Sequence, residues 1–281
     1  MGKVIAAVLI LGFLFLGSQE GSASLLDTEC GMRGLRHILK MHDGTENDRQ
    51  ANPWMVSLIV NGEVKCSGSL INDRIVLTAA HCVFNDEMHV HFGTTFSFDR
   101  RNPGVLQESC RADANCVRVD KKIVPSQFRE RQHLQYDIAL LRMQHAVQYS
   151  DVVRPICLLK NEPAVARFHI TSWGKTEEGY PLIPRVLVTD DVKRIDRQLC
   201  SRKFQWPVDE SQICVRSKTS NACRGDSGGP MSAEILHMGR YRTFQFGIIS
   251  YGLGSCAGLN VCTNVTHYMD WIVSVLASSS A

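Results

Sequence analysis

The sequence lacks an apolar run long enough to cross a lipid bilayer. Its longest run, Val4–Leu16, has thirteen residues, whereas a membrane-spanning helix needs about 20. Lys3 precedes this run, and small or polar residues follow it through Ser24, which is the layout of a secretory signal peptide. The alternative is a membrane anchor, which the short run disfavours. We therefore expect residues 1–23 to be a signal peptide and the protein to be secreted and extracellular.

An excess of charge of one sign is also missing. The chain has 31 lysines and arginines against 28 aspartates and glutamates, a formal net charge of +3. This balance argues against nucleic-acid binding as the main function. The pattern His-Glu-x-x-His does not occur, which disfavours a metal-dependent hydrolase of that kind. We expect neither a cofactor nor a metal.

Helical periodicity is scarce before the C-terminus. Short apolar runs divided by Gly, Pro, Asn and Asp predict an all-β sandwich or barrel. The runs are Met55–Val60, Ser69–Ile71, Ile75–Thr78, His89–Phe92, Ile138–Met143, Val186–Val192 and Phe244–Tyr251. Only residues 266–277 place apolar side chains on one helix face, which predicts a C-terminal helix.

Cysteine, in contrast, is abundant. Eleven cysteines are too many for a routine reduced cytosolic enzyme and indicate an oxidising compartment. The odd number means that at least one cysteine is not paired within the chain. Sequence alone does not determine which cysteines pair.

Three local sequences carry the chemistry. Ser227 lies in Cys-Arg-Gly-Asp-Ser-Gly-Gly-Pro, His81 in Thr-Ala-Ala-His-Cys, and Asp137 in Asp-Ile-Ala-Leu-Leu. A serine hydroxyl needs a partner base to act as a nucleophile at neutral pH. The chain order His, Asp, Ser and these motifs resemble the chymotrypsin-like (trypsin-family) serine proteases, in particular insect-type zymogens with a short disulfide-tethered pro-segment. The resemblance covers residues 41–275.

This resemblance implies a fold and a domain organisation. The all-β prediction becomes two antiparallel six-stranded β-barrels followed by the C-terminal helix. The first barrel is expected over about residues 41–150 and the second over about 160–262. Together with the helix they form a serine protease domain over residues 41–281, preceded by a pro-segment at residues 24–40.

The resemblance also implies a mechanism. Ser227 attacks the scissile carbonyl, His81 takes the serine proton and passes it to the leaving amine, and Asp137 orients the imidazole. The backbone N–H groups of Gly225 and Ser227 form the oxyanion hole. Protein or peptide substrates follow as partners, together with protein protease inhibitors; neither nucleic acid nor a membrane is expected as a partner.

The resemblance also implies activation by cleavage, because proteases of this family are made as zymogens. Counting back from the motif around Trp54 places the cut between Lys40 and Met41, where relatives begin with Ile or Val. A cut after Arg36 is an alternative, but it spaces the following glycine wrongly. In the family the freed amine pairs with the acid before the serine, here Asp226.

The resemblance assigns five disulfides and leaves one cysteine over. Cys30, in the pro-segment, bridges to the enzyme body at Cys157. The other pairs, of which the third is a local clip in a loop that simpler relatives lack, are Cys66–Cys82, Cys200–Cys214, Cys110–Cys116 and Cys223–Cys256. Cys262 remains. It is interpreted as a buried unpaired thiol, with an intermolecular bridge as the alternative.

The specificity pocket departs from the trypsin pattern. Its floor position is Asn221, where a trypsin-like pocket has an aspartate. The wall positions match Gly252 and Asn260, the second replacing a usual glycine. The pocket is therefore expected to be neutral, polar and narrowed, and to disfavour Lys and Arg. A different protease of basic specificity is then needed to cut after Lys40.

Two questions stay open from the sequence. Asn264 begins an Asn-Val-Thr triplet that fits the N-glycosylation pattern, although such triplets also occur by chance. The main rival to the enzyme is a catalytically inactive homologue that binds or regulates other proteins. Such homologues usually lose a triad residue, and this chain keeps all three.

Overall fold

The computed structural model describes most of the expected protease domain and a short part of the pro-segment. The described residues are 27–33, 52–93, 110, 113–128, 134–161, 163, 165–173, 187–217, 227–252 and 258–279. The expected signal peptide and activation bond lie outside these ranges. So do several expected site residues: Lys40, Met41, Asn221, Cys223, Gly225, Asp226 and Cys256.

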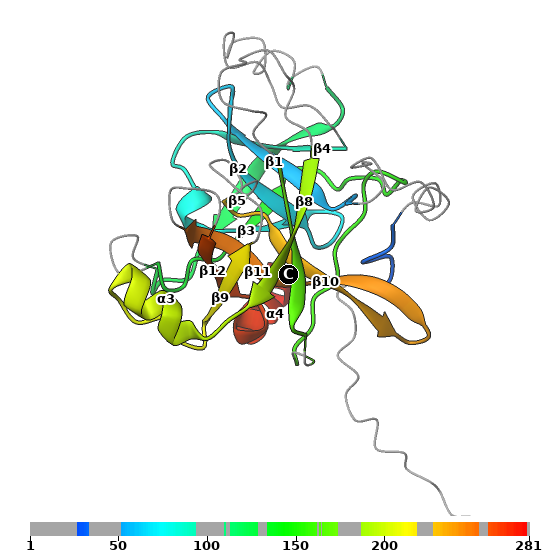
Figure 1. The fold of residues 1–281 in the computed structure, drawn as a ribbon. Coiled ribbons are helices and arrows are strands. Elements are labelled where there is room, and N and C mark those ends of the chain that lie inside the picture. Colours follow the sequence, from blue (N-terminus) through cyan, green and yellow to red (C-terminus); the bar gives the residue numbers. More distant parts are fainter. Residues whose placement is uncertain are drawn as a thin grey trace, which may run out of the picture.

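Among the described residues, two closed antiparallel barrels of six strands each make up the fold, as the family resemblance implied (Figure 1). The first barrel closes in the order β1-β2-β3-β6-β5-β4. Its strands are β1 (Met55–Val60), β2 (Glu63–Leu70), β3 (Ile75–Thr78), β4 (Met88–Phe92), β5 (Cys116–Ile123) and β6 (Ala139–Met143).

The second barrel closes in the order β10-β11-β12-β9-β8-β7. Its strands are β7 (Arg167–Trp173), β8 (Leu187–Arg194), β9 (Gln212–Ser217), β10 (Pro230–His237), β11 (Arg240–Gly252) and β12 (Gly258–Asn264). Each barrel encloses its own apolar core, one around the fully buried Trp54 and Leu140, the other around Phe168 and Phe246. Closure also removes exposed strand edges.

Two strands begin earlier in the sequence than the apolar runs that predicted them. β2 begins at Glu63, upstream of the run that starts at Ser69, because the strand pairs with β1 from Glu63 onward, and Lys65 in this first part is exposed. β11 begins at Arg240, because its outer part forms a hairpin with β10 in which Tyr241 is exposed. Apolar periodicity indicates which residues are buried, so it does not predict the solvent-exposed ends of these strands.

The C-terminal helix is present but is divided in two. A 3-10 turn, η3 (Thr266–Tyr268), leads into α4 (Met269–Ser279). Another helix, α3 (Arg197–Phe204), was not predicted, because Cys200 is its only buried residue and it shows no apolar stripe. Asp196 caps α3 by accepting a hydrogen bond from the backbone N–H of Gln198. Among the described residues, no helix is both long and apolar enough to cross a membrane.

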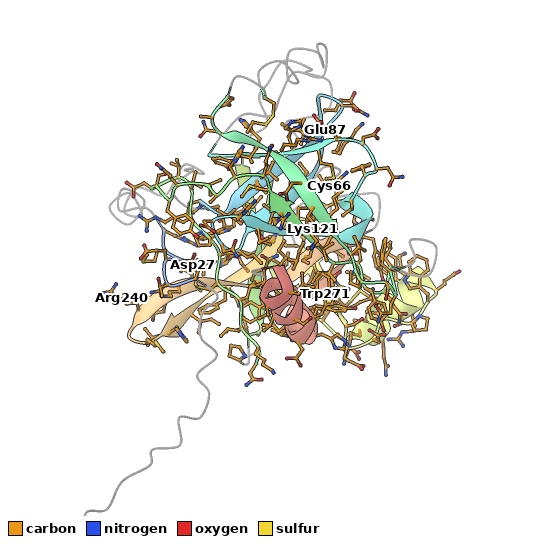
Figure 2. All side chains as sticks on the ribbon, turned by 180° about the vertical axis from the view of Figure 1, so that it is seen from behind. Asp27, Cys66, Glu87, Lys121, Arg240 and Trp271 are labelled. Carbon is orange, nitrogen blue, oxygen red and sulfur yellow. A yellow bond between two sulfur atoms is a disulfide. The ribbon has the colours of Figure 1, made fainter. Side chains whose placement is uncertain are left out.

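Residues 27–33 of the expected pro-segment are built into the second barrel. Cys30 is disulfide-bonded to Cys157 and is buried in the same core as Phe244. The N–H of Gly31 donates to Pro155, and its carbonyl accepts from Thr243 at 3.0 Å. Figure 2 shows Asp27 of this segment beside the hairpin that carries Arg240. The segment is therefore held against the second barrel by a disulfide and by backbone hydrogen bonds.

A side chain cannot replace the glycine at the centre of this segment. Gly31 has a φ of +68°, and a Cβ there would lie 2.6 Å from the carbonyl oxygen of Thr243. Glycine alone adopts that backbone conformation without strain and leaves room for so close an approach. Around it, Arg242 donates to the carbonyls of Thr28 and Cys30 at 2.8 and 2.6 Å.

The structure joins four of the five cysteine pairs that the resemblance implied: Cys30–Cys157, Cys66–Cys82, Cys110–Cys116 and Cys200–Cys214. The fifth pair lies outside the described residues. Cys262 is an unpaired thiol, fully buried in the second barrel. Burial raises its pKa to about 12, so it packs as a small hydrophobe and is not a reactive thiolate at neutral pH.

Candidate active site

A histidine and a buried aspartate are paired at the junction of the two barrels. His81 lies in the 3-10 turn η2 (Ala80–Cys82), which follows β3. Its ring Nδ1 is 2.7 Å from Oδ2 of Asp137, and its backbone N–H donates to Oδ1 at 2.9 Å. A carboxylate can only accept, so Nδ1 carries the proton and Nε2 is left as the basic nitrogen. The ring is thereby set in the tautomer that a general base requires.

Asp137 is completely buried and has donors beyond the histidine. The hydroxyl of Ser250 in β11 donates to its Oδ2. The hydroxyl of Thr263 in β12 donates to its main-chain carbonyl at 2.7 Å. A buried carboxylate is costly unless it is hydrogen-bonded, and here the second barrel supplies donors to an aspartate that precedes a strand of the first.

The expected nucleophile lies where the second barrel touches the first. The carbonyl of Ser227 accepts a hydrogen bond of 2.8 Å from the backbone N–H of Ser67 in β2. The next residue, Gly228, has a φ of +83° and donates to Ile249 at 2.9 Å. A Cβ on Gly228 would lie 2.2 Å from Oγ1 of Thr78. Only glycine permits this close approach of the serine loop to the strand that leads to His81.

These contacts bring the three motifs together. Ser67, which holds Ser227, is next to Cys66, and Cys66 is disulfide-bonded to Cys82 beside His81. Ile249, which holds Gly228, is next to Ser250, the donor to Asp137. The loop that carries Ser227 is therefore hydrogen-bonded to residues adjacent to those that hold His81 and Asp137.

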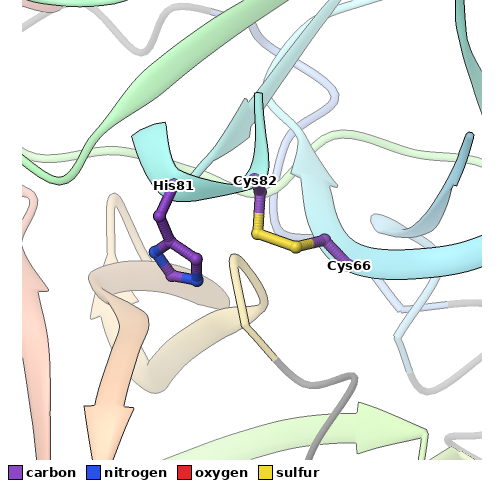
Figure 3. A group of neighbouring side chains, drawn as sticks. All are labelled: Cys66, His81 and Cys82. Atoms are coloured by element: carbon purple, nitrogen blue, oxygen red, sulfur yellow. A yellow bond between two sulfur atoms is a disulfide. The ribbon is translucent and has the colours of Figure 1, made fainter. Parts of the chain in front are cut away.

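The sulfur atoms beside His81 do not form a metal site. Ligand atoms of Cys66, His81 and Cys82 lie within 4.8 Å of one another. Figure 3 shows the three side chains, with a bond between the two sulfur atoms. The two sulfurs are bonded to each other, and a metal requires thiolates. This bridge instead pins the turn that carries the histidine.

Two of the three expected pocket residues are in contact. Gly252 in β11 pairs with Asn260 in β12. A Cβ on Gly252 would lie 2.0 Å from Oδ1 of Asn260, so the asparagine side chain lies directly over the glycine. Beside them, Tyr251 accepts a hydrogen bond of 3.0 Å from the indole of Trp206. The third expected pocket residue, Asn221, lies outside the described residues.

Asn264, the expected glycosylation site, is engaged in the fold. It is 8% exposed at the end of β12. Its side-chain nitrogen donates to the carbonyl of Glu210 at 2.9 Å, and its side-chain oxygen accepts from Thr266 at 2.7 Å. Attachment of a glycan uses that same nitrogen, which is bonded within the fold. The glycan stays a prediction from the sequence pattern.

Sequence reasoning missed the supporting hydroxyls of Ser250 and Thr263. Their partner Asp137 is 113 and 126 residues away in the chain. No local pattern reports contacts at that separation. A signal was nonetheless present for one of them, because Ser250 directly precedes the Tyr-Gly pair that marks the pocket wall.

The family model for trypsin matches residues 41–272 of the chain. The chain belongs to the trypsin family of serine proteases. As in that family generally, it is a serine endopeptidase, a hydrolase that acts on protein substrates. The match contains both barrels and the three motifs.

Similar proteins include two insect proteases. "Serine protease grass" of Drosophila melanogaster is 32% identical over 262 residues, which cover 85% of this chain and 68% of that protein. "CLIP domain-containing serine protease B15" of Anopheles gambiae is 31% identical, with 88% and 72% covered. The crystal structure of Drosophila Grass, described as a clip serine protease of the Toll pathway, matches with a TM-score of 0.67 and 28% identity, covering 84% of this chain and 72% of that one.

Proposed function

We propose that this trypsin-family protease is a secreted zymogen that hydrolyses peptide bonds through a triad of Ser227, His81 and Asp137. The observation that carries the proposal is the buried Asp137, bonded to both the backbone and the ring of His81, with the serine loop anchored on the strand beside them. An aspartate so placed orients an imidazole toward a nucleophile. A catalytically inactive homologue would have no need of this arrangement.

The chemical steps follow from these roles. Ser227 Oγ attacks the scissile carbonyl while Nε2 of His81 removes its proton. The tetrahedral intermediate collapses as His81 donates that proton to the leaving amine, which leaves an acyl-enzyme. Water then repeats the sequence and releases the acid. Through both halves, the N–H groups of Gly225 and Ser227 stabilise the oxyanion, and Asp137 stabilises the imidazolium.

Activation belongs to the same proposal. Residues 1–23 are removed as a signal peptide, and residues 24–40 stay attached to the protease domain at 41–281 through the bridge at Cys30. Cleavage after Lys40 frees the amine of Met41, which pairs with Asp226 and completes the oxyanion hole. The docking of residues 27–33 into the second barrel supports a pro-segment that remains bound, an arrangement suited to an extracellular cascade.

The specificity is for neutral side chains. Asn221 has no charge to offset that of a lysine or arginine, and Asn260 covers Gly252 on the wall. A cation that enters such a pocket sheds water without compensation. The activating partner is therefore a different protease, one with basic specificity.

The triad is tested by substitution. Ser227→Ala, His81→Ala and Asp137→Asn should each lower kcat of the cut enzyme by about 10⁴-fold or more without impairing secretion. Because the residues act as a unit, Ser227→Ala with His81→Ala should be little worse than either alone. Undiminished turnover by Ser227→Ala would end the proposal.

The pocket is tested with a peptide library. The cut wild type should cleave after neutral residues, and Asn221→Asp should raise the rate after Lys and Arg, with a further rise when Asn260→Gly is added. As a control, pure zymogen incubated alone should stay uncut. A dominant preference of the wild type for Lys or Arg, or self-activation, would contradict the assignment of Asn221 and Asn260.

A further inference from the structure

The chain makes an unusual turn just before Asp137. Tyr136 has a φ of +58°, in the left-handed region, which is a genuine outlier for a bulky side chain. Its carbonyl accepts a hydrogen bond of 2.8 Å from the N–H of Ile138, so the turn closes around the aspartate itself. Such a conformation persists only when its surroundings impose it, and it is often found at functional sites.

A tyrosine from the other end of the chain holds this turn. The phenol oxygen of Tyr268, in η3, accepts a hydrogen bond of 3.1 Å from the backbone N–H of Tyr136. The two rings meet edge to face, with centroids 5.8 Å apart. Tyr268 is 5% exposed, whereas Tyr136 is 37% exposed. The buried ring is therefore the fixed partner, and the strained residue is the one being held.

Tyr268 is itself firmly placed and stays protonated. Its backbone N–H donates to the carbonyl of Val265 at 3.0 Å. Burial raises the pKa of the phenol, which keeps it neutral at physiological pH. The residue before Tyr136, Gln135, donates to Asp209 at 2.8 Å. Both residues that precede Asp137 are therefore bound by segments outside the barrel strands, Asp209 before β9 and Tyr268 after β12.

We propose that Tyr268 is a positioning residue for the triad: by accepting from the N–H of Tyr136 it holds the left-handed turn that aims the carboxylate of Asp137 at His81. The proposal rests on the catalytic role given above to Asp137. Thr263 and Ser250 hold Asp137 from its other side. Tyr268 touches neither substrate nor reacting atoms, and it acts on catalysis only through this turn.

The first test removes a single oxygen. In the cut enzyme, Tyr268→Phe keeps the buried ring and should lower kcat on a chromogenic peptide amide by about tenfold, with KM within twofold, because a misplaced catalytic group slows the chemical step. Tyr149→Phe is the matched control, since it also removes one hydrogen-bonded phenol oxygen, here one that donates to Asp27 and makes no contact with the turn at Tyr136. It should leave kcat unchanged. An unchanged kcat in Tyr268→Phe would overturn the proposal.

The second test reads the backbone conformation directly. Tyr136→Gly and Tyr136→Val both remove the ring at a partly exposed position, but only glycine adopts a positive φ freely. The glycine variant should keep kcat near that of the wild type, and the valine variant should lose about tenfold at similar KM. Adding Tyr136→Gly to Tyr268→Phe should restore most of the lost kcat. Equal kcat values for the glycine and valine variants, or no restoration, would refute the role of the turn.

These outcomes are distinct from a failure of the proposed function. If Ser227→Ala kept its turnover, the triad itself would be wrong. If Ser227→Ala were inactive and Tyr136→Gly and Tyr136→Val had equal kcat values, only the role of Tyr268 would be refuted. The Tyr136 variants also decide the matter if Tyr268→Phe does not fold.

Discussion

At the scale of single residues, the site depends on close contacts that tolerate no extra atom. Gly228 is the clearest case, because a Cβ there would meet Thr78 Oγ1 at 2.2 Å and the carbonyl of Ser67 at 2.3 Å. One of these neighbours leads to His81, and the other holds the carbonyl of Ser227. A shift of either therefore changes the distance between nucleophile and base.

We expect Gly228→Ala to reduce both stability and activity. Steric overlap and a positive φ together should cost about 3 kcal/mol or more in free energy of unfolding. Gly239→Ala is a matched control, since it has a φ of +77° but no heavy atom within 4 Å of its Cβ. It should cost about 1 kcal/mol and leave kcat unchanged. Urea denaturation and turnover of the cut enzyme measure both quantities.

The two glycines share a positive φ, but only Gly228 is in close contact with other residues. The difference between their alanine variants therefore measures the effect of the steric contact alone. If the two alanine variants lost equal stability and Gly228→Ala kept its kcat, the serine loop would not be packed against β2 and β3 as described. Either result alone would weaken that part of the account.

At the scale of elements, residues 27–33 of the expected pro-segment are bonded to the second barrel. Cys30–Cys157 joins residues 127 apart in sequence, whereas Cys110–Cys116 joins residues six apart. In the chain-entropy model a disulfide that closes a longer loop stabilises more. The former also lies in a core cluster with Phe244.

Removal of these two disulfides should therefore have unequal effects. In the uncut chain, Cys30→Ala with Cys157→Ala should lower the free energy of unfolding by about 5 kcal/mol, and Cys110→Ala with Cys116→Ala by about 2 kcal/mol. Thermal denaturation should show the larger fall in Tm for the first pair. An equal or reversed order would mean that residues 27–33 contribute little to the second barrel.

Some of the strands were predicted correctly from the sequence, and one helix was not predicted. Runs such as Ile75–Thr78 coincide with a strand, because all four side chains are buried. The helix α3 was missed, since its exposed polar residues carry no periodic signal. Apolar patterns report which faces are buried, but they do not report which strands pair. The arrangement as two barrels came only from the family resemblance.

At the scale of the whole molecule, the site exists only where the barrels meet. Ser69 in the first barrel donates to Gln245 in the second at 2.5 Å, and Thr263 reaches Asp137 across the same boundary. The motifs supplied the candidate triad residues because each motif is a short stretch of the sequence. The hydroxyls that hold them come from more than 100 residues away, and only the fold brings them into contact.

The most direct measurement of the central claim is covalent labelling of the chain by a fluorophosphonate, located by mass spectrometry. Only a serine activated by a paired histidine reacts rapidly with such a reagent. After cleavage at Lys40, we expect one adduct, on Ser227, with far slower labelling of the uncut chain and none in Ser227→Ala. A folded, cut chain that acquires no adduct on Ser227 would contradict the account.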